Sequence, residues 1–358
     1  MAVKPPPPLR TLVMLGDIML GRYVDDAISA WGPRRAGVWH DTLPLLCPPT
    51  TRQLVTGNLE CAITEYPHPT PNKTFNFKLS PSNAGVLTDA NIKFVSLANN
   101  HSLDYHEQGL LDTMSTLDSK GIKYAGVGYK EEAAAPVTDT STSTRVSFLS
   151  FSDHYKEWAA TDTKRGINYI NPASYDREHL REQIQSAAST ADRLIVFVHW
   201  GSNWCWHPPA SIQTLAHDFI DFGADAVFGH SAHHIQGIEV RHGRYPIIYG
   251  AGGFIDDYAL REEYRNDLGF VYVLHVGGDV GQEIEVWTAL ELMPIQIVHQ
   301  WRQRDDPDPH PPYFSFVKQA KGGEKEWLGE TIKRLSQEQF GTKVMDRGDG
   351  EGFYITLR

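Results

Sequence analysis

Five short apolar runs in the sequence are each followed at once by residues that can ligate a metal ion. The five junctions are Leu15-Gly16-Asp17, Gly57-Asn58-Leu59-Glu60, Ala98-Asn99-Asn100-His101, Val198-His199-Trp200-Gly201 and Phe228-Gly229-His230-Ser231-Ala232-His233-His234. Carboxylate, amide and imidazole donors together suit Mn, Fe or Zn. Two such ions about 3.5–4 Å apart can activate water for an in-line displacement at phosphorus. The sequence therefore predicts a site for one or two divalent ions.

The role of each residue in this site is predicted from its donor type. Asp17 and Glu60 are expected to neutralise the charge, with Glu60 bridging two ions, and the remaining predicted metal ligands are Asn100, His199, His230 and His233. His101 follows the ligand Asn100 directly, and we assign it as the general acid that protonates a leaving group. Asn100 and His101 are thus the predicted catalytic residues.

Each of these residues also has a purely structural interpretation when it is taken alone. An aspartate after a strand, such as Asp17, is commonly a turn residue or a helix cap. His199, at the end of an apolar run, could be a hydrogen-bonded core histidine, and residues 99–101 could form an Asx turn. Three histidines within five residues after Gly229 are difficult to explain by packing, so residues 230–234 give the strongest local signal for metal binding.

Cationic, polar and aromatic residues close to these motifs are the predicted substrate-binding set. Arg22 and Lys78 can hold an anionic group through charge-assisted hydrogen bonds, although each could also be a solvated surface residue. Trp200 belongs to a tryptophan-rich segment that is predicted to form a pocket wall or lid, or otherwise to pack in the core. Asn58 and His234 complete the set.

Other catalytic motifs in the sequence are incomplete. Residues 229–233 begin like the Gly-x-Ser-x-Gly nucleophile elbow but lack its last glycine, which argues against a Ser231 hydrolase. Residues 126–128 lack the third glycine of a dinucleotide-binding fingerprint. The sequence contains no GxxxxGK[ST] loop, which argues against ATP-driven ligation by this chain.

The elements that must position these residues have the pattern of an α/β layered fold, because short β-branched runs alternate with segments of helical period. The predicted buried strands are 11–15, 54–56, 94–97, 194–198 and 226–228. A helical pattern between the last two strands predicts that they are parallel neighbours. Since ligands bind outside the carboxyl ends of parallel strands, the five junctions are expected to converge.

The rest of the chain is predicted to extend this core. Closely spaced strands over 237–293 predict an antiparallel continuation, and 302–313 is predicted to be a charged, proline-rich loop. Residues 1–10 are a proline-rich tail, and 11–358 are expected to form a single domain. Within it, 302–358 is a C-terminal extension packed on the rest, with one more helix and a last strand.

Composition narrows the class of protein. The chain has 358 residues, 41% of them apolar and 22% charged, which is typical of a globular protein. Its net charge of −11, without a Lys/Arg-rich block, argues against nucleic acid as a partner. Three cysteines without a CxxC pair indicate a reducing compartment. Because the sequence has no signal-peptide pattern and no apolar run of about 18 residues, we expect a cytoplasmic protein without a membrane anchor.

Six motifs, in this order, resemble those of the CapA-type capsule and poly-γ-glutamate biosynthesis proteins, which belong to the calcineurin-like metallophosphoesterase superfamily. The motifs are Gly16-Asp17-Ile18-Met19-Leu20-Gly21-Arg22, Asn58-Leu59-Glu60, the run from Ser96 to Asp104, His199-Trp200-Gly201, the run from Gly229 to Gly237, and Tyr249-Gly250-Ala251-Gly252. The resemblance extends from about Leu12 to Val276 and implies an α/β, four-layer αββα sandwich with mixed sheets. It also implies that the six predicted ligands match the ligand motifs of the superfamily, with His101 in the place of its catalytic histidine.

Three departures from the superfamily pattern bear on the number of ions. Met19 stands where superfamily phosphoesterases usually have a histidine, which removes one ligand from the first metal. Glu60 stands where an aspartate usually bridges, and the histidines of the last motif are three residues apart instead of two. The ligand set therefore allows one ion, or two ions that are held unequally.

Three functions are compatible with this sequence. The first is a metal-dependent hydrolase of the CapA type, in which metal-activated water attacks a phosphoester or a glutamyl-type amide and His101 protonates the leaving group. The second is a Lewis-acid dehydratase or cyclase that acts on a small metabolite. The third is a non-catalytic partner in poly-γ-glutamate-type biosynthesis. The expected partner is a small-molecule or glutamyl-containing substrate, and the oligomeric state is left open.

Overall fold

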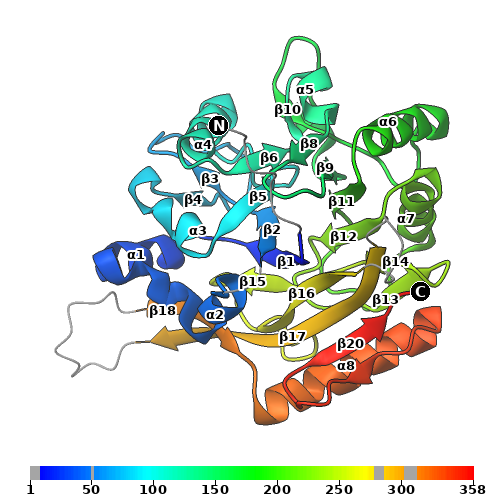
Figure 1. The fold of residues 1–358 in the computed structure, drawn as a ribbon. Coiled ribbons are helices and arrows are strands. Elements are labelled where there is room, and N and C mark those ends of the chain that lie inside the picture. Colours follow the sequence, from blue (N-terminus) through cyan, green and yellow to red (C-terminus); the bar gives the residue numbers. More distant parts are fainter. Residues whose placement is uncertain (1–8, 50–51, 278–285, 302–312) are drawn as a thin grey trace, which may run out of the picture.

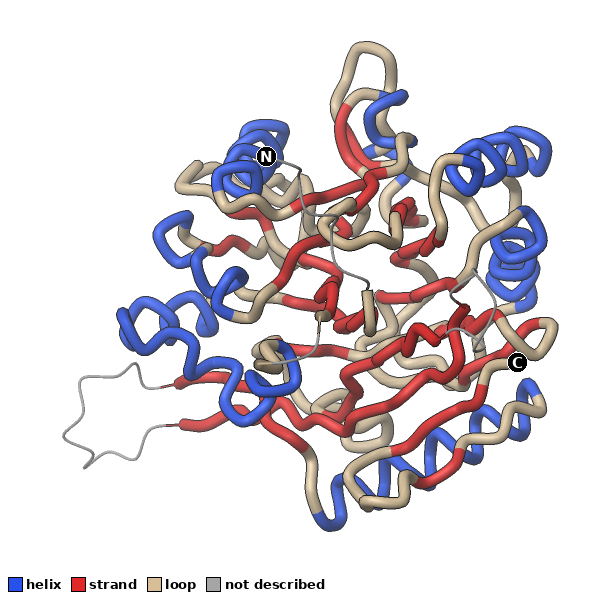
Figure 2. The backbone as a smooth tube through the Cα atoms, viewed as in Figure 1, coloured by secondary structure: helices blue, strands red, loops and turns tan. Residues whose placement is uncertain are grey.

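The computed structural model describes residues 9–49, 52–277, 286–301 and 313–358. Most of the predicted tail and of the loop predicted at 302–313 therefore lie outside the described residues. The fold is built on two large mixed β-sheets that pack face to face, with helices around the outside (Figures 1 and 2).

The larger sheet contains both parallel and antiparallel strands. In spatial order its strands are β19 (Met345–Asp346), β20 (Phe353–Thr356), β17 (Val286–Trp301), β16 (Leu268–Gly277), β1 (Thr11–Ile18), β2 (Gln53–Leu59), β5 (Ile92–Ser96) and β6 (Lys123–Ala125), with β15 (Gly253–Ile255) paired to β1 and β18 (Tyr313–Gln319) paired to β17. Strands β15, β1, β2, β5 and β6 run parallel, whereas β16, β17, β18 and β20 continue the sheet antiparallel.

The smaller sheet has a parallel centre and antiparallel edges. Its order is β13 (Ile238–Arg241), β14 (Tyr245–Ile248), β12 (Ala226–His230), β11 (Arg193–His199), β9 (Val146–Ser152) and β8 (Val137–Asp139). Two short ladders lie beside the sheets, namely β3 (Ala62–Ile63) with β4 (Lys78–Leu79), and β7 (Val127–Gly128) with β10 (Gly166–Ile167).

Alternation along the central strands explains why the sheets stack. In β1, Leu12 and Met14 face a core shared with Phe148 and Phe228 of the smaller sheet. Their neighbours Val13 and Leu15 belong to a second core on the outer face of the larger sheet. Because successive side chains of a strand point to opposite faces, a strand that is apolar throughout must be covered on both sides.

Helices provide that outer cover. The α-helices are α1 (Tyr23–Trp31), α2 (Leu43–Leu46), α3 (Gly85–Asp89), α4 (His106–Ser119), α5 (Lys130–Ala134), α6 (Arg177–Ser189), α7 (Ala210–Phe222) and α8 (Gly322–Phe340), and the 3₁₀ segments are η1 (Gly32–Thr42), η2 (Pro81–Asn83) and η3 (Lys156–Trp158). Apolar residues of α1, α3 and α4 pack on the larger sheet, and those of α6 and α7 pack on the smaller one. This arrangement confirms the predicted four-layer αββα sandwich.

The predicted central strands are confirmed, and most are longer than expected. Strand β1 continues through Asp17 to Ile18, β11 ends at His199 and β12 ends at His230, so these site residues belong to the strands themselves. β11 and β12 are parallel neighbours, as predicted.

The prediction that 237–293 is wholly an antiparallel continuation was wrong in part. Strand β14 pairs with β12 in parallel and belongs to the smaller sheet, whereas β16 and β17 pair antiparallel in the larger one. Closely spaced strands indicate hairpins, but their spacing alone does not determine which sheet each strand joins. Within the described part of the chain, every helix is too short or too polar to cross a membrane.

Candidate metal centre

The carboxyl ends of strands from both sheets bring three predicted ligands together. Asp17 lies near the end of β1, Glu60 follows β2, and His233 lies in the loop after β12. One ligand atom from each of these three buried residues lies within 4.8 Å of the others. The convergence predicted from the five junctions is therefore present for these side chains.

Glu60 belongs to this group and forms no side-chain hydrogen bond within the described residues. Its side chain is fully buried, and neither carboxylate oxygen accepts a hydrogen bond from any described residue. Nδ1 of His233 is 3.9 Å from Oε2, and Nε2 of His199 is 3.9 Å from Oε1. A buried carboxylate without a donor is costly, so an atom outside the described chain is needed to satisfy it.

Two further predicted ligands also have a buried side-chain atom that could bind a metal and that lacks a hydrogen-bond partner in the described part of the chain. Oδ1 of Asn100 and Nε2 of His199 are buried, and among the described residues neither has a hydrogen-bond partner. Together with Glu60 they present amide, imidazole and carboxylate lone pairs, which is the donor chemistry that Mn, Fe and Zn accept. The residues of this site therefore fit a divalent metal ion.

His233 is turned back toward the carboxylates by an unusual loop. Ser231 and His233 both have positive φ angles, 92° and 58°, in the region that non-glycine residues seldom adopt. In this conformation Nδ1 of His233 is 3.1 Å from Oδ2 of Asp17. Such backbone strain persists where the surrounding structure enforces it, and here it brings the predicted ligand His233 beside Asp17.

Asn58 links two of the predicted ligands through its side-chain amide. Its Nδ2 donates to Oδ1 of Asp17 at 2.8 Å and lies 3.3 Å from Nδ1 of His199. Asn99, which the sequence did not single out, donates to Oδ1 of Asn58 at 3.1 Å. Hydrogen bonds of this kind fix the orientation of metal ligands. The structure thus places Asn58, predicted to bind substrate, in a hydrogen-bond network with the predicted ligands Asp17 and His199.

His101 presents one ring nitrogen to the candidate centre and uses the other for anchoring. Its Nε2 is 3.7 Å from Oε1 of Glu60. Its Nδ1 lies 2.6 Å from Oδ2 of Asp104 and 2.9 Å from Nζ of Lys73. Neither Lys73 nor Asp104 is among the site residues predicted from the sequence. With its ring held at Nδ1, His101 can exchange a proton with a bound molecule only through Nε2.

The rings of His230 and His234 contact backbone carbonyl oxygens, whereas that of His233 contacts Asp17. Nε2 of His230 is 3.4 Å from the carbonyl oxygen of Leu15, and its ring stacks on Phe197 at 5.6 Å. The ring of His234 lies between carbonyl oxygens of Ala232 and Cys205, at 2.7 Å from Nδ1 and 3.0 Å from Nε2. The structure therefore places His230 beside the three-residue group and His234 away from it.

Burial and mutual electrostatic interactions shift the pKa values of the ionisable groups in this centre. Burial and the nearby Asp17 raise the pKa of Glu60 well above its usual range. Burial would also raise the pKa of Asp17, but a hydrogen bond with His233 and the neighbouring histidines lower it. For His233, burial is outweighed by Glu60 and Asp17, which raise its pKa to about 9. Burial lowers the pKa of His199 well below its usual range and that of His101 to about 4. A bound cation would stabilise both carboxylates in the ionised form.

A pocket of about 500 Å³ opens beside His233. It is lined by Arg22, Tyr23, Phe75, Phe77, Asn203, Trp204, His233, Asp257, Tyr258, Ala259 and Arg261. Nε of Arg22 donates to Oδ1 of Asp257 at 3.0 Å, and the guanidinium carbon lies 4.8 Å from the ring centre of Phe77. A fixed cation above aromatic rings is suited to an anionic ligand.

The remaining predicted substrate-binding residues lie outside this pocket. Nζ of Lys78 lies 3.4 Å from the carbonyl oxygen of Tyr66. Trp200 is buried in the core of the smaller sheet, where its Nε1 donates to the carbonyl oxygen of Tyr249 at 2.9 Å. This is the packing alternative for Trp200, and the pocket tryptophan is Trp204.

Comparisons with known proteins point to one family. Residues 11–258 match the model of a family described as bacterial capsule synthesis protein, PGA_cap. A probable polyglutamine synthesis accessory protein of Mycobacterium tuberculosis is 30% identical over 96% of this chain and 95% of its own length. A capsule biosynthesis protein CapA of Bacillus anthracis is 28% identical over 69% of this chain and 60% of its own length. Among solved structures, a phosphatase of Mycoplasma pneumoniae aligns with a TM-score of 0.47 and 13% identity, covering 80% of this chain and 92% of its own.

Proposed function

The chain belongs to the bacterial capsule synthesis protein family PGA_cap, and within that family we propose that it is a metal-dependent hydrolase. Its substrate is a phosphoester or a glutamyl-type amide. Family membership supports a role in capsule or polyglutamate synthesis, and the hydrolytic activity is our own proposal. Asp17, Glu60, Asn100, His199 and His233 would hold the metal, and His230 stays a predicted ligand beside them.

The observation that carries the proposal is the set of buried donor atoms without partners. Both oxygens of Glu60, Oδ1 of Asn100 and Nε2 of His199 have no hydrogen-bond partner within the described ranges. A structural role would have satisfied these atoms within the protein, because buried polar groups are almost always hydrogen-bonded. A divalent ion bound there would supply Lewis acidity and lower the pKa of water toward about 7.

The protein's own residues would bind the substrate and move a proton. Arg22 lines the pocket beside His233 and can pair with a phosphate or carboxylate group of the substrate. Nε2 of His101 faces Glu60 and could give a proton to the leaving group, with Asp104 at Nδ1 stabilising the charged ring against the burial that lowers its pKa. Phe77 stacks on the His101 ring at 4.1 Å and limits the access of water.

Metal content and hydrolysis test the proposal together. The purified chain is expected to retain Mn, Fe or Zn, and Asp17→Ala or the double variant His199→Ala, His230→Ala to lose it. Hydrolysis of model phosphoesters or γ-glutamyl peptides should stop on chelation and resume when the ion is returned. A chain that binds no metal after reconstitution, or a metal-loaded chain that cleaves neither substrate class, would contradict the proposal.

A non-catalytic role is the second candidate, because the M. tuberculosis relative is named an accessory protein. In that case the histidines are structural, and removing His199 and His230 together should leave the assembly function intact if the fold survives. The dehydratase or cyclase alternative is distinguished by product analysis, since it incorporates no labelled oxygen from water.

Arg22 offers a direct test of substrate binding. We expect Arg22→Ala to raise KM by about 10–100-fold for an anionic substrate, because a hydrogen bond to a charged group contributes roughly 1.5–3 kcal/mol. Steady-state kinetics of metal-loaded protein measure this change. Arg35→Ala is the matched control, since Arg35 pairs with Asp89 and does not line the pocket. An unchanged KM in Arg22→Ala would remove Arg22 from the substrate site.

A further inference from the structure

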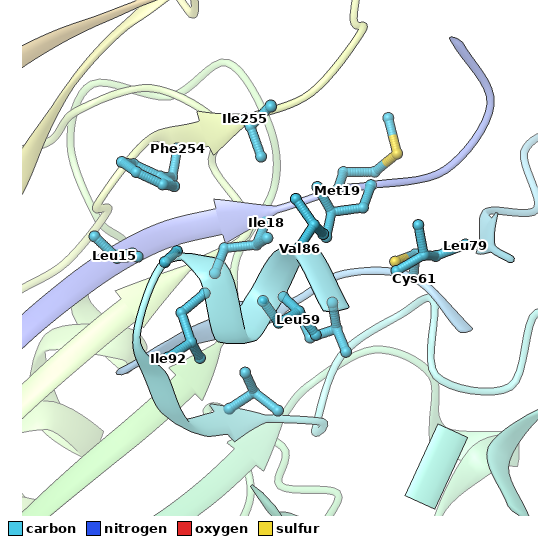
Figure 3. Packing of buried hydrophobic residues seen from close by; sticks show 14 of the residues in the cluster. Leu15, Ile18, Met19, Leu59, Cys61, Leu79, Val86, Ile92, Phe254 and Ile255 are labelled. Atoms are coloured by element: carbon cyan, nitrogen blue, oxygen red, sulfur yellow. The ribbon is translucent and has the colours of Figure 1, made fainter. Parts of the chain in front are cut away.

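A segment that the proposed function leaves unused, Gly252–Tyr258, places a carboxylate at the same sheet edge as the candidate ligands. Strand β15 pairs in parallel with β1, with Ile255 opposite Ile18, and the amide of Met19 donates to the carbonyl oxygen of Ile255 at 2.9 Å. Figure 3 shows Ile255 beside Ile18 and Met19. Asp256 therefore follows β15 at the edge where β1 ends, one residue after Asp17, because parallel strands have their carboxyl ends on one side.

The side chain of Asp256 is buried, and within the described ranges only one of its two carboxylate oxygens accepts a hydrogen bond. It is 1% exposed. Its Oδ1 accepts a hydrogen bond from the amide of Tyr258 at 2.9 Å, whereas its Oδ2 has no hydrogen-bond partner in the part of the chain that the structure describes. A Cβ atom on Gly253 would lie 2.7 Å from Oδ2, so the glycine leaves room for the carboxylate. A carboxylate oxygen in this condition requires a cation or a donor.

Asp256 also shares its electrostatic surroundings with the metal centre. The charge of Asp256 acts on both Glu60 and His233, and Asp17 and His233 act on Asp256 in turn. Burial, with Asp17 and Asp257 nearby, raises the pKa of Asp256 to about 7 even though His233 opposes the shift. The ring of Tyr258, two residues later, lies 4.9 Å from the ring of His233. On its other side, Nε2 of His299 is 3.8 Å from Oδ1.

We propose that Oδ2 of Asp256 is a further protein ligand of the divalent ion held by Asp17, Glu60 and His233. Asp17, Glu60 and His233 supply three donor atoms within 4.8 Å of one another, and together with Asn100 and His199 they would leave one position open on an ion such as Mn, which takes up to six ligands. Oδ2 of Asp256 lies outside this close group of three, but it is buried and has no hydrogen-bond partner among the described residues. The inference rests on the metal centre of the proposed function and adds a ligand to it.

Equilibrium binding of Mn²⁺ to the full, metal-free chain tests this assignment. Asp256→Asn keeps the size of the side chain but removes its charge, and we expect Mn²⁺ affinity to fall at least ten-fold, since even the loss of a group that supports a ligand costs 10–100-fold. Asp218→Asn is the control. Asp218 is a buried carboxylate whose oxygens are paired with Tyr175 and Arg177, so its variant should bind Mn²⁺ as the wild type does.

A second variant reports ligation directly and is independent of affinity. In Asp256→Cys a thiolate replaces the carboxylate, and Co²⁺ bound at the site should show a thiolate-to-cobalt charge-transfer band that wild-type protein lacks, because thiolates bind such ions well. Equal Mn²⁺ affinity in Asp256→Asn and wild type, or no such band in Asp256→Cys, would overturn the inference alone. A wild-type chain that binds no Mn²⁺ overturns the metal centre as well.

Discussion

Replacing Glu60 with glutamine is expected to abolish tight binding of the divalent ion. Glu60 is the residue that lies close to Asp17, His199 and His233 alike, and both of its oxygens are without partners in the described residues. Glutamine has nearly the same shape, but it offers one neutral oxygen in place of two charged ones. Elemental analysis of the purified variant should therefore find the metal lost, together with hydrolytic activity.

The same substitution should change stability in opposite directions with and without metal. Without metal, Glu60→Gln removes a buried carboxylate that Asp17 and burial both disfavour, so the variant should be more stable than wild type by about 1–3 kcal/mol. With an ion at 100 times its Kd, wild type gains about 2.7 kcal/mol and the variant gains almost nothing. Denaturant unfolding of both proteins, with and without Mn²⁺, measures the two differences.

Asp218→Asn is the control for Glu60→Gln. Asp218 is another buried carboxylate, but it accepts hydrogen bonds from Tyr175 and Arg177. Its variant should lose stability by a similar amount whether or not metal is present, because a paired carboxylate has been removed far from the ion. If Mn²⁺ stabilised Glu60→Gln as much as wild type, Glu60 would not be a ligand.

The fold could be predicted largely because the central strands are apolar on both faces. Residues 11–15 and 194–198 have no polar face, and such strands must lie between layers. Helix α7 could be predicted from its apolar periodicity, and its end from the glycine at position 223. The sheet to which β14 belongs could not be predicted, because β-pairing joins segments that lie far apart in sequence.

The candidate site could be predicted where a polar residue ends an apolar run. This rule found Asp17, Glu60 and His199. It missed Lys73, which lies in a segment without periodicity and reaches His101 only through the tertiary fold. Asp256 follows the short run Gly253–Ile255 and could have been found by the same rule, but this run begins with a glycine that follows another, Gly252, and has only two apolar side chains, so it does not have the pattern of a buried strand.

His234 shows the opposite limit of sequence reasoning. A cluster of histidines signals metal binding, but it does not tell which rings face the metal. Ser231 and His233 have positive φ angles that redirect successive side chains, so His233 faces Asp17 while His234 faces the carbonyl oxygen of Cys205. Such a backbone path is set by the surrounding structure, and local residue types do not specify it.

Replacing His101 with alanine is expected to lower kcat by about 10²–10⁴-fold while metal content stays unchanged. The physical reason is the orientation of the ring. Nδ1 is held by Asp104 and Lys73, so Nε2, which faces Glu60, is the atom available to protonate a leaving group. Neither ring nitrogen is needed to hold the ion, because Asp17, Glu60 and His233 remain. Single-turnover kinetics and elemental analysis on the same sample measure both quantities.

A control variant and a comparison of two kinds of substrate test whether His101 acts as a general acid. His106→Ala removes an exposed histidine five residues further along the chain, at the first residue of α4, and should leave kcat unchanged. A substrate whose leaving group needs no protonation, such as a nitrophenyl ester, should lose far less activity in His101→Ala than an alkyl ester or an amide, because general acid catalysis matters only where a basic atom departs. An equal loss for both substrates would indicate that His101 positions a ligand such as Asn100. Full activity in His101→Ala would remove His101 from the mechanism.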